Sequence, residues 1–325
     1  MKKIAVTMGD PGGVGPEIIV KALTSSGIGN LCAPIVIGDA SVIEKALDLL
    51  NLHLELKMID SPDKFRPSRK AIGVIHTGQF GSSIRKKPTA EGGMASVSYI
   101  KKAVELALNK QVDGIVTAPI SKEALKMSGF RWPGHTEMLA DLTHTEDFAM
   151  MLVGGPLRVI LVTIHTALKN VPGLITKQQI IKTIRHAVRA CYMLGIKDPK
   201  IAVAGLNPHA GESGMFGSEE LKKIIPAVKA ALREGIPVSG PFPPDTIFNK
   251  AFKGEIDITV CMYHDQGLIP LKMIAFEKGV NVTLGLPFIR TSPDHGTAYD
   301  IAWKGIADPS SMIEAIKLAA ILRTS

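Results

Sequence analysis

Three histidines of this chain each lie just past a short apolar run that is typical of a buried strand. They are His165, His209 and His264. Because ligands of open α/β sheets bind at the edge where the strands end, we expect these side chains to gather at such an edge. Three neutral imidazoles around an open position would bind Zn²⁺, Co²⁺ or a similar ion. The alternative is that the three histidines have independent roles, since no short zinc motif joins them.

A metal held in this way allows two reactions, which are hydrolysis by a metal-bound hydroxide and oxidation of an alcohol. Oxidation by hydride transfer needs a dinucleotide, and two glycine-bearing loops near the ends of the chain could provide its site. The first loop runs from Gly9 to Glu17 and leads into a helix. A helix N-terminus behind such a loop can bind an anion through backbone N–H groups. The alternative is a tight strand-to-helix turn without a ligand. Asp39 follows the second strand, where a dinucleotide-binding domain has its ribose-binding acid.

Two further stretches hold candidate polar groups. His135 precedes Thr136 at the expected start of a helix, where it would either lie near a bound anion or belong to a structural cap. Asp245 lies in a proline-rich loop at 241–246, which makes it a candidate acid or base or, equally, a helix cap.

Strand-like and helical segments alternate along the chain, which predicts an α/β fold with a mostly parallel sheet and covering helices. The length of 325 residues fits two domains. The most apolar window, 149–168, contains Gly154-Gly155-Pro156 and is expected to be two strands around a turn, not a membrane span. Helices are expected at 41–50, 91–109, 180–192, 218–233, 268–276 and 310–322.

The composition narrows the class of partner. Hydrophobic residues make up 46% of the chain and charged residues 21%, which is typical of a soluble globular protein. The net charge of +8 is spread without a basic run, so we expect anionic small molecules as partners and neither nucleic acid nor membrane. Three widely spaced cysteines and the lack of a signal-peptide region favour a reducing cytoplasm.

Five motifs, in order over essentially the whole chain, resemble the 4-hydroxythreonine-4-phosphate dehydrogenase family of vitamin B6 biosynthesis, which includes the related D-threonate 4-phosphate dehydrogenases. The motifs are Gly9-Asp10-Pro11-Gly12-Gly13-Val14-Gly15-Pro16-Glu17, Gly134-His135-Thr136-Glu137, Asn207-Pro208-His209-Ala210-Gly211-Glu212, Tyr263-His264-Asp265-Gln266-Gly267 and Asp294-His295-Gly296-Thr297-Ala298. The two ends of the chain are also similar to the isocitrate and isopropylmalate dehydrogenase group. The sequence departs from the family pattern at Trp303, where such loops usually have glycine. A large ring at this position could reshape the expected adenosine pocket.

The resemblance implies a two-domain isocitrate/isopropylmalate dehydrogenase-like fold with helices on both faces of mostly parallel sheets and an active-site cleft between the domains. The expected first domain is discontinuous (1–125 plus 268–325), and the second is 126–267. The implied metal ligands, shared between the subunits of a homodimer, are His165, His209 and His264. The implied substrate residues are His135, Thr136, Lys272, Asn281 and Arg290. The implied NAD or NADP residues are Gly12, Gly13, His295, Gly296, Thr297 and Ala298, which moves the expected cofactor site away from Asp39. Lys272 and Asp245 are the candidate catalytic residues.

The resulting prediction is an NAD(P)- and divalent-metal-dependent dehydrogenase, with Zn, Co or Mg as the metal. It would oxidise and decarboxylate 4-phosphooxy-L-threonine to 3-amino-2-oxopropyl phosphate. A close alternative is the oxidation of D-threonate 4-phosphate to dihydroxyacetone phosphate. The alternatives from other classes are a metal-dependent phosphoester hydrolase that uses the same histidines and a non-catalytic protein that binds an anionic metabolite.

Overall fold

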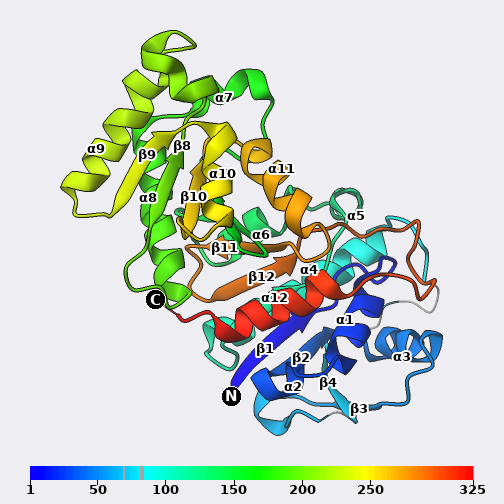
Figure 1. Cartoon of the computed structure of the whole chain (residues 1–325). Coiled ribbons are helices and arrows are strands. Elements are labelled where there is room, and N and C mark those ends of the chain that lie inside the picture. The colour runs from blue at the N-terminus through cyan, green and yellow to red at the C-terminus, as the bar shows by residue number, and fades with distance from the viewer. Residues whose placement is uncertain (69, 79, 81–83, 325) are drawn as a thin grey trace. The chain divides into compact units, whose positions relative to one another are not determined.

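The chain divides into two compact units, each built on its own set of strands (Figure 1). The computed structural model describes residues 1–68, 70–78, 80 and 84–324. Unit 1 comprises Met1–Glu146 and Leu286–Ile321, and unit 2 comprises Asp147–Gly285 with the last residues from Leu322 on. The first unit is therefore discontinuous in sequence. The chain passes between the units later than the expected boundaries after residues 125 and 267, because α6 and α11 each stay with the unit that precedes them.

The described strands of unit 1 form a parallel sheet in the order β3-β4-β2-β1-β5-β12. The central strands are aliphatic and almost completely buried, as a sheet covered on both faces requires. Because these strands are parallel, the loops that follow β1, β5 and β12 leave from the same edge. The strands are β1 (Lys2–Thr7), β2 (Cys32–Gly38), β3 (Glu55–Met58), β4 (Ala71–His76), β5 (Gly114–Thr117) and β12 (Ile289–Pro293).

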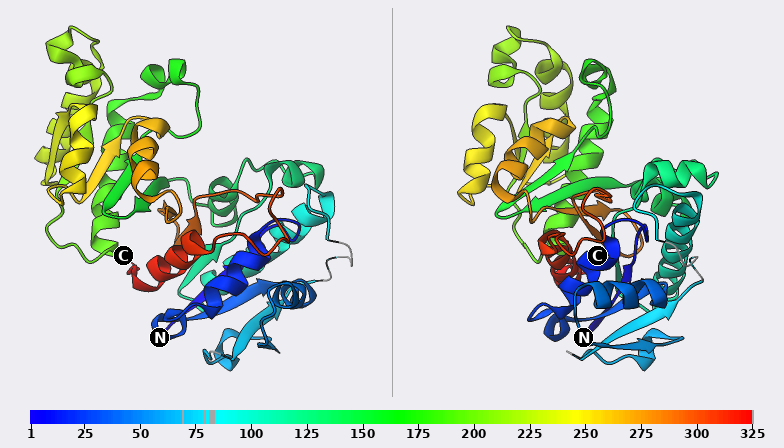
Figure 2. Two further views of the ribbon diagram at one scale, coloured as in Figure 1. Left: turned by 45° about the vertical axis from the view of Figure 1, so that its right-hand side comes forward. Right: turned by 90° about the vertical axis from the view of Figure 1, so that its right-hand side faces the viewer.

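The helices of unit 1 cover both faces of its sheet. Helices α1, α2, α3 and α12 pack together on one face, and α4 packs on β1 and β2 from the other (Figure 2). Helix α4 begins where the Thr89 side chain accepts a hydrogen bond from Gly92 N. The helices are α1 (Gly15–Thr24), α2 (Ile28–Leu31), α3 (Ala40–Leu49), α4 (Ala90–Leu108), α5 (Lys122–Met127), α6 (His135–Leu142) and α12 (Ser310–Ile321), with a 3₁₀ turn at Pro62–Lys64.

Unit 2 has a mixed sheet in the order β11-β6-β7-β10-β8-β9. Strands β7, β10, β8 and β9 are parallel, whereas β6 runs antiparallel to β11 and β7. The apolar window at 149–168 is thus a hairpin that turns at Gly155, with φ of 54°, as expected. The strands are β6 (Ala149–Gly154), β7 (Leu157–Leu161), β8 (Ile201–Ala204), β9 (Val238–Phe242), β10 (Ile258–Cys261) and β11 (Val280–Leu284).

Alternation along the strands of unit 2 sends side chains into two layers. Val159 and Leu161 of β7 belong to a buried cluster with Ile247 of α10 and Leu271 of α11. Helix α8 packs against β7, β8 and β10, and α9 lies beside it. The helices are α7 (Val171–Leu174), α8 (Lys177–Met193), α9 (Ile225–Arg233), α10 (Pro244–Phe252) and α11 (His264–Ala275). Shorter turns occupy η2 (Leu168–Asn170), η3 (Pro208–Gly214) and the π-helical η4 (Glu220–Ile224).

The predicted α/β class, with mostly parallel sheets and helices on both faces, is confirmed. Two helix predictions need correction. Helix α11 begins at His264, not at Leu268, because the buried Gln266 side chain accepts a hydrogen bond from Met262 N at 2.6 Å. The helix expected over 218–233 starts as the π-helical turn η4 before it continues as α9. Across the described residues, no helix combines the length and apolarity needed to cross a membrane.

Candidate active site

Two of the three candidate metal ligands lie together in unit 2. His264 is the first residue of α11, directly beyond β10, and His165 lies in the loop that follows β7. Because β7 and β10 are parallel neighbours, their carboxyl ends place these two side chains side by side. The centroids of the two rings are 5.6 Å apart with an angle of 43° between the planes.

Carboxylates orient two of the candidate ligands. His264 Nδ1 lies 2.7 Å from Asp265 Oδ1, and His209 Nδ1 lies 3.2 Å from Glu212 Oε2. A carboxylate on one ring nitrogen fixes the tautomer and leaves the other nitrogen for a ligand, as in many metal-binding histidines. In both residues the nitrogen left for a ligand is Nε2.

His209 lies on a turn of unusual geometry after β8. Residues 209–213 all have left-handed backbone angles, from φ 42° at Glu212 to φ 83° at Gly211. Each such residue with a Cβ costs about 1–2 kcal/mol, so this turn stores strain, which is common at functional sites. The His209 side chain is 62% exposed and its ring packs edge-on against Phe216.

The third candidate ligand does not join the other two within one chain. Over the described residues, there is no group of three or more His, Cys, Asp or Glu side chains that could hold a metal ion. The strand-end prediction therefore brings His165 and His264 together and leaves His209 on its own turn.

Unit 1 places a cation and a neutral imidazole among its candidate substrate residues. Arg290 on β12 is only 2% exposed, donates to Thr117 Oγ1 at 2.7 Å, and burial lowers the pKa of its guanidinium to about 9. His135 begins α6, and its Nε2 is buried without a hydrogen-bond partner. Burial, followed by the charge of Arg290, holds the pKa of His135 well below its usual 6.5. Thr136 beside it is buried. An anion would find a fixed positive charge here, and a hydroxyl group could donate to the unused imidazole nitrogen.

The other candidate residues for substrate and catalysis belong to unit 2. Asn281 lies on β11, and its Oδ1 is buried without a hydrogen-bond partner. Lys272 on α11 is half-buried, with its amine 5.9 Å from the centroid of the Phe276 ring. Asp245 is exposed in the first turn of α10, where its side chain makes no cap.

The two glycine-bearing loops pack against each other in unit 1. Val14 N donates to Thr297 O at 2.9 Å, and Tyr299 donates to the buried carboxylate of Asp10 at 2.7 Å. A Cβ added at Gly13 would lie 2.9 Å from Thr297 O, so this position has no room for a side chain. His295 and Gly296, just before these contacts, are exposed, whereas Gly12 and Gly13 are buried. The loops expected to bind the dinucleotide thus pack together, and of these four residues only His295 and Gly296 are exposed.

Glu17 and Trp303 complete this arrangement, and Glu17 is a residue whose role the sequence did not reveal. The Glu17 carboxylate is fully buried and accepts hydrogen bonds from Trp303 N and, at 2.8 Å, from Gly305 N. Trp303 has a left-handed φ of 59°, which explains why a glycine suits this position. Its indole donates to Pro11 O at 3.0 Å and so ties the late loop to the first one. The position of Glu17 in the first turn of a helix was the only available signal.

Asp39 has a structural role. Its carboxylate caps α3 by accepting from Ser41 N at 3.0 Å and also accepts from Phe80 N at 2.7 Å. These bonds satisfy the carboxylate, so the ribose-binding role considered for Asp39 has no support here.

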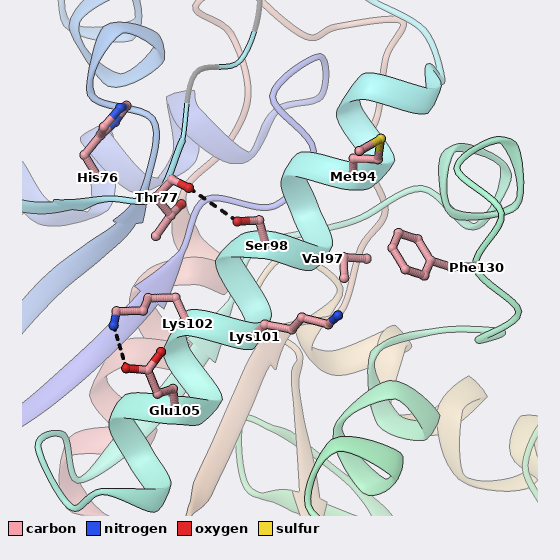
Figure 3. A pocket seen from close by; sticks show the side chains of 9 residues that line it. All are labelled: His76, Thr77, Met94, Val97, Ser98, Lys101, Lys102, Glu105 and Phe130. Carbon is pink, nitrogen blue, oxygen red and sulfur yellow. Dashed lines mark hydrogen bonds and ion pairs between the residues drawn. The ribbon is translucent and has the colours of Figure 1, made fainter.

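A groove of about 470 Å³ lies elsewhere on unit 1, along α4 (Figure 3). Its lining includes His76, Met94, Lys101 and Phe130, and none of the candidate site residues. Lys102 is engaged with Glu105 at 2.6 Å, and Ser98 bonds the backbone of Thr77. This groove is separate from the residues that the sequence singled out.

His135 makes stability depend on pH. Its pKa is depressed in the folded state, so below pH 6.5 the unfolded chain binds a proton that the folded chain does not. Stability therefore falls as the pH drops through that value. Between about pH 7.5 and about pH 5, urea midpoints should fall less for His135→Gln than for the wild type. The exposed His53→Gln is the control, and equal falls in all three proteins would contradict the assignment.

Glu17→Gln should loosen the late loop. The amide N–H₂ would face a backbone N–H of residue 303 or 305, leaving a buried donor unpaired at a cost of about 1–3 kcal/mol. Urea denaturation should show this loss, and hydrogen exchange should rise at residues 303–305. Glu44→Gln on the exposed face of α3 serves as the matched control. Wild-type stability in Glu17→Gln would show that these hydrogen bonds are dispensable.

Comparisons with known proteins agree in pointing to one family. The model of the family "Pyridoxal phosphate biosynthetic protein PdxA" matches residues 30–319. A 4-hydroxythreonine-4-phosphate dehydrogenase of Desulforapulum autotrophicum is 50% identical over 324 residues, which cover 99% of this chain and 95% of that protein. A D-threonate 4-phosphate dehydrogenase of Cupriavidus necator is 46% identical, covering 99% and 97%.

A solved structure supports the same assignment. The crystal structure of 4-hydroxythreonine-4-phosphate dehydrogenase from Klebsiella pneumoniae superposes with a TM-score of 0.90 at 45% identity, covering 98% of each chain. The likeness therefore extends over the fold as well as over the motifs. With a family model matched over most of its length and relatives at about half identity over nearly all of it, this chain belongs to the PdxA family of pyridoxal phosphate biosynthetic proteins.

Proposed function

We propose that this chain is an NAD(P)-dependent dehydrogenase that oxidises and decarboxylates 4-phosphooxy-L-threonine to 3-amino-2-oxopropyl phosphate in vitamin B6 biosynthesis. The observation that carries the proposal is 50% identity, over 99% of the chain, to a protein named 4-hydroxythreonine-4-phosphate dehydrogenase. When bound, the nicotinamide cofactor would supply a hydride acceptor, and a divalent metal would supply Lewis-acid polarisation of oxygen. The tasks of the protein's own residues are to bind, orient and shield the substrate.

The buried polar groups of unit 1 suit a substrate with phosphate and carboxylate groups. Arg290 offers a planar set of donors whose positive charge is desolvated, and this strengthens its pairing with an anion. His135 remains neutral and bonds the backbone of Ala118, so its unpartnered Nε2 can accept a hydrogen bond from a substrate hydroxyl without adding charge. Thr136, Lys272 and Asn281 are proposed to bind the same substrate. Asp245 is proposed as the base and Lys272 as a second proton-transfer group.

The donor set fits a borderline metal ion. Imidazole nitrogens suit Zn²⁺ or Co²⁺, whereas Mg²⁺ prefers oxygen ligands. The orientation of His209 and His264 by carboxylates at Nδ1 agrees with ligation through Nε2. We therefore propose His165, His209 and His264 as the ligands, with Zn²⁺ or Co²⁺ favoured over Mg²⁺.

A homodimer would account for the separation of His209 from the other two histidines. Unit 2 exposes large apolar side chains on the two segments that carry His264 and His209, namely Ile269 and Met273 on α11, Phe276 just after it, and Met215 and Phe216 after the turn of His209. Apolar side chains exposed in such groups are typical of protein interfaces. In a two-fold dimer, His209 of the partner subunit would complete the pair formed by His165 and His264.

The cofactor is proposed to bind along the joined glycine loops of unit 1. The residues are Gly12, Gly13, His295, Gly296, Thr297 and Ala298. We propose a cytoplasmic location, in keeping with the three buried free thiols, of which burial raises the pKa of Cys32 to about 11 and of Cys191 to about 12.

A second candidate function is the oxidation of D-threonate 4-phosphate to dihydroxyacetone phosphate. It is favoured by the 46% identity with the dehydrogenase of Cupriavidus necator that is named for this substrate. The two substrates differ in an amino or a hydroxyl group at C2, next to the carboxylate. The choice between them needs an assay.

Purified protein with Co²⁺ or Zn²⁺ should reduce NAD⁺ or NADP⁺ in the presence of one of the two phosphorylated acids. Absorbance of the reduced cofactor measures both the preferred substrate and the preferred cofactor. Arg290→Lys should raise KM by about 10-fold or more, since an ammonium cannot replace a bidentate guanidinium. Release of inorganic phosphate without any dinucleotide would favour the phosphoester hydrolase instead, and tight binding without turnover would favour a binding protein.

Mixing two inactive variants should restore activity if the metal site is shared. A hybrid of His209→Ala and His264→Ala subunits has one intact ligand set, so a random mixture should regain about a quarter of wild-type activity. The matched control is His165→Ala mixed with His264→Ala, which should stay inactive because these two histidines come from the same subunit. Recovery in the control, or none in the test mixture, would refute the shared site.

A further inference from the structure

The left-handed turn that carries His209 needs support from outside itself. Of residues 209–213, only Gly211 lacks a Cβ, so the other four residues adopt a left-handed conformation that is unfavourable for them. Backbone hydrogen bonds close the two ends of the turn, among them Ala210 N to Asn207 O at 3.1 Å and Phe216 N to Gly211 O at 3.2 Å. A conformation of this kind persists only where the surrounding structure holds it.

Glu220 provides that support from the opposite side of the turn. The residue is only 1% exposed. Its Oε1 accepts hydrogen bonds from Leu206 N at 2.7 Å and from Asn207 N at 2.8 Å, and its Oε2 accepts from Asn207 Nδ2 at 2.9 Å. These are charge-assisted hydrogen bonds. Their donors belong to residues 206 and 207, which lie between the end of β8 and the left-handed turn.

The same carboxylate also touches the far side of the turn. A Cβ added at Gly211 would lie 2.7 Å from Glu220 Oε2, and one at Gly205 would lie 3.2 Å from Oε1. The backbone on both sides of His209 thus packs closely around one buried carboxylate. Glu220 itself begins the π-helical turn η4, an irregularity that is frequent at functional sites.

We propose that Glu220 is a positioning residue for the reaction: it holds the backbone of residues 205–212 so that His209 presents its imidazole to the metal ion. The inference rests on the proposed function, because it takes His209 as a ligand. Glu220 acts through the backbone, whereas Glu212 orients the imidazole ring itself. Gln266 reinforces the same segment by donating to Gly205 O at 2.7 Å from the first turn of the helix that begins with His264.

The test compares Glu220→Gln with Glu234→Gln in the full-length protein. Glu234 is a suitable control because its carboxylate also receives three hydrogen bonds in unit 2, in this case from the Arg185 side chain. Calorimetric titration with Zn²⁺ should show an affinity about 10-fold or more lower for Glu220→Gln and unchanged for Glu234→Gln. Affinity for NAD⁺ should stay at the wild-type value in both variants. Hydrogen exchange of the 205–214 segment should rise in Glu220→Gln alone.

Three outcomes separate this inference from the function on which it rests. Loss of Zn²⁺ binding in His209→Ala, with wild-type affinity in Glu220→Gln, would overturn the role of Glu220 and keep the metal site. Absence of Zn²⁺ binding by the wild type would overturn both. Wild-type hydrogen exchange at 205–214 in Glu220→Gln would refute the positioning role regardless of the metal.

A second variant covers the case in which Glu220→Gln does not fold. Gly211→Ala places a methyl group against Glu220 Oε2 and requires alanine to adopt a φ of 83°. It should weaken Zn²⁺ binding in the same direction by displacing the turn from the carboxylate. Unchanged affinity in a folded Gly211→Ala protein would count against the proposal.

Discussion

A buried backbone N–H group that has left a sheet or a helix needs another acceptor, and this requirement governs the loops that carry the candidate site. In unit 1 the Glu17 carboxylate accepts from the backbone of residues 303 and 305. In unit 2 the Glu220 carboxylate accepts from the backbone of residues 206 and 207. Glu17 projects from the first turn of α1 into a loop that is distant in the sequence. Glu220 projects from the first turn of η4 into a loop whose backbone is strained. The loops can leave regular structure because these carboxylates replace the lost hydrogen bonds.

Burial also determines the charge of the groups that would meet the substrate. Desolvation lowers the pKa of Arg290 to about 9, which still leaves the guanidinium positive at neutral pH. The same burial, with the neighbouring positive charge, keeps His135 neutral. At Asp10, burial raises the pKa, while hydrogen bonds from Tyr299 and Gly12 oppose that shift. The combination of one fixed cation and a neutral hydrogen-bonding ring is suited to binding an anion without a second buried charge.

The order of the parallel strands in unit 2 determines which candidate metal ligands lie together. Parallel strands end at the same edge, so residues that follow β7 and β10 meet even though about a hundred positions separate them in the sequence. His209 follows the next parallel strand, β8, on a left-handed turn, and among the described residues it does not form a metal-binding group with the pair. The simplest arrangement that agrees with the pairing of His165 and His264 and with the separate position of His209 is a site in which a partner subunit provides the third ligand.

The sequence alone determined the α/β class and the elements next to the candidate site, because strand and helix periodicity depend on neighbouring residues. It also predicted that His165 and His264 lie at strand ends, and it found the two glycine loops that pack together around Val14 and Thr297. Only the tertiary structure decided which buried groups support those loops. A glutamate in a first helical turn is an ordinary residue by pattern, and nothing local distinguishes Glu17 or Glu220 from an exposed one. Their roles depend on backbone amides far away in the sequence or held in a left-handed turn, and such partners are set by packing, which no local pattern records.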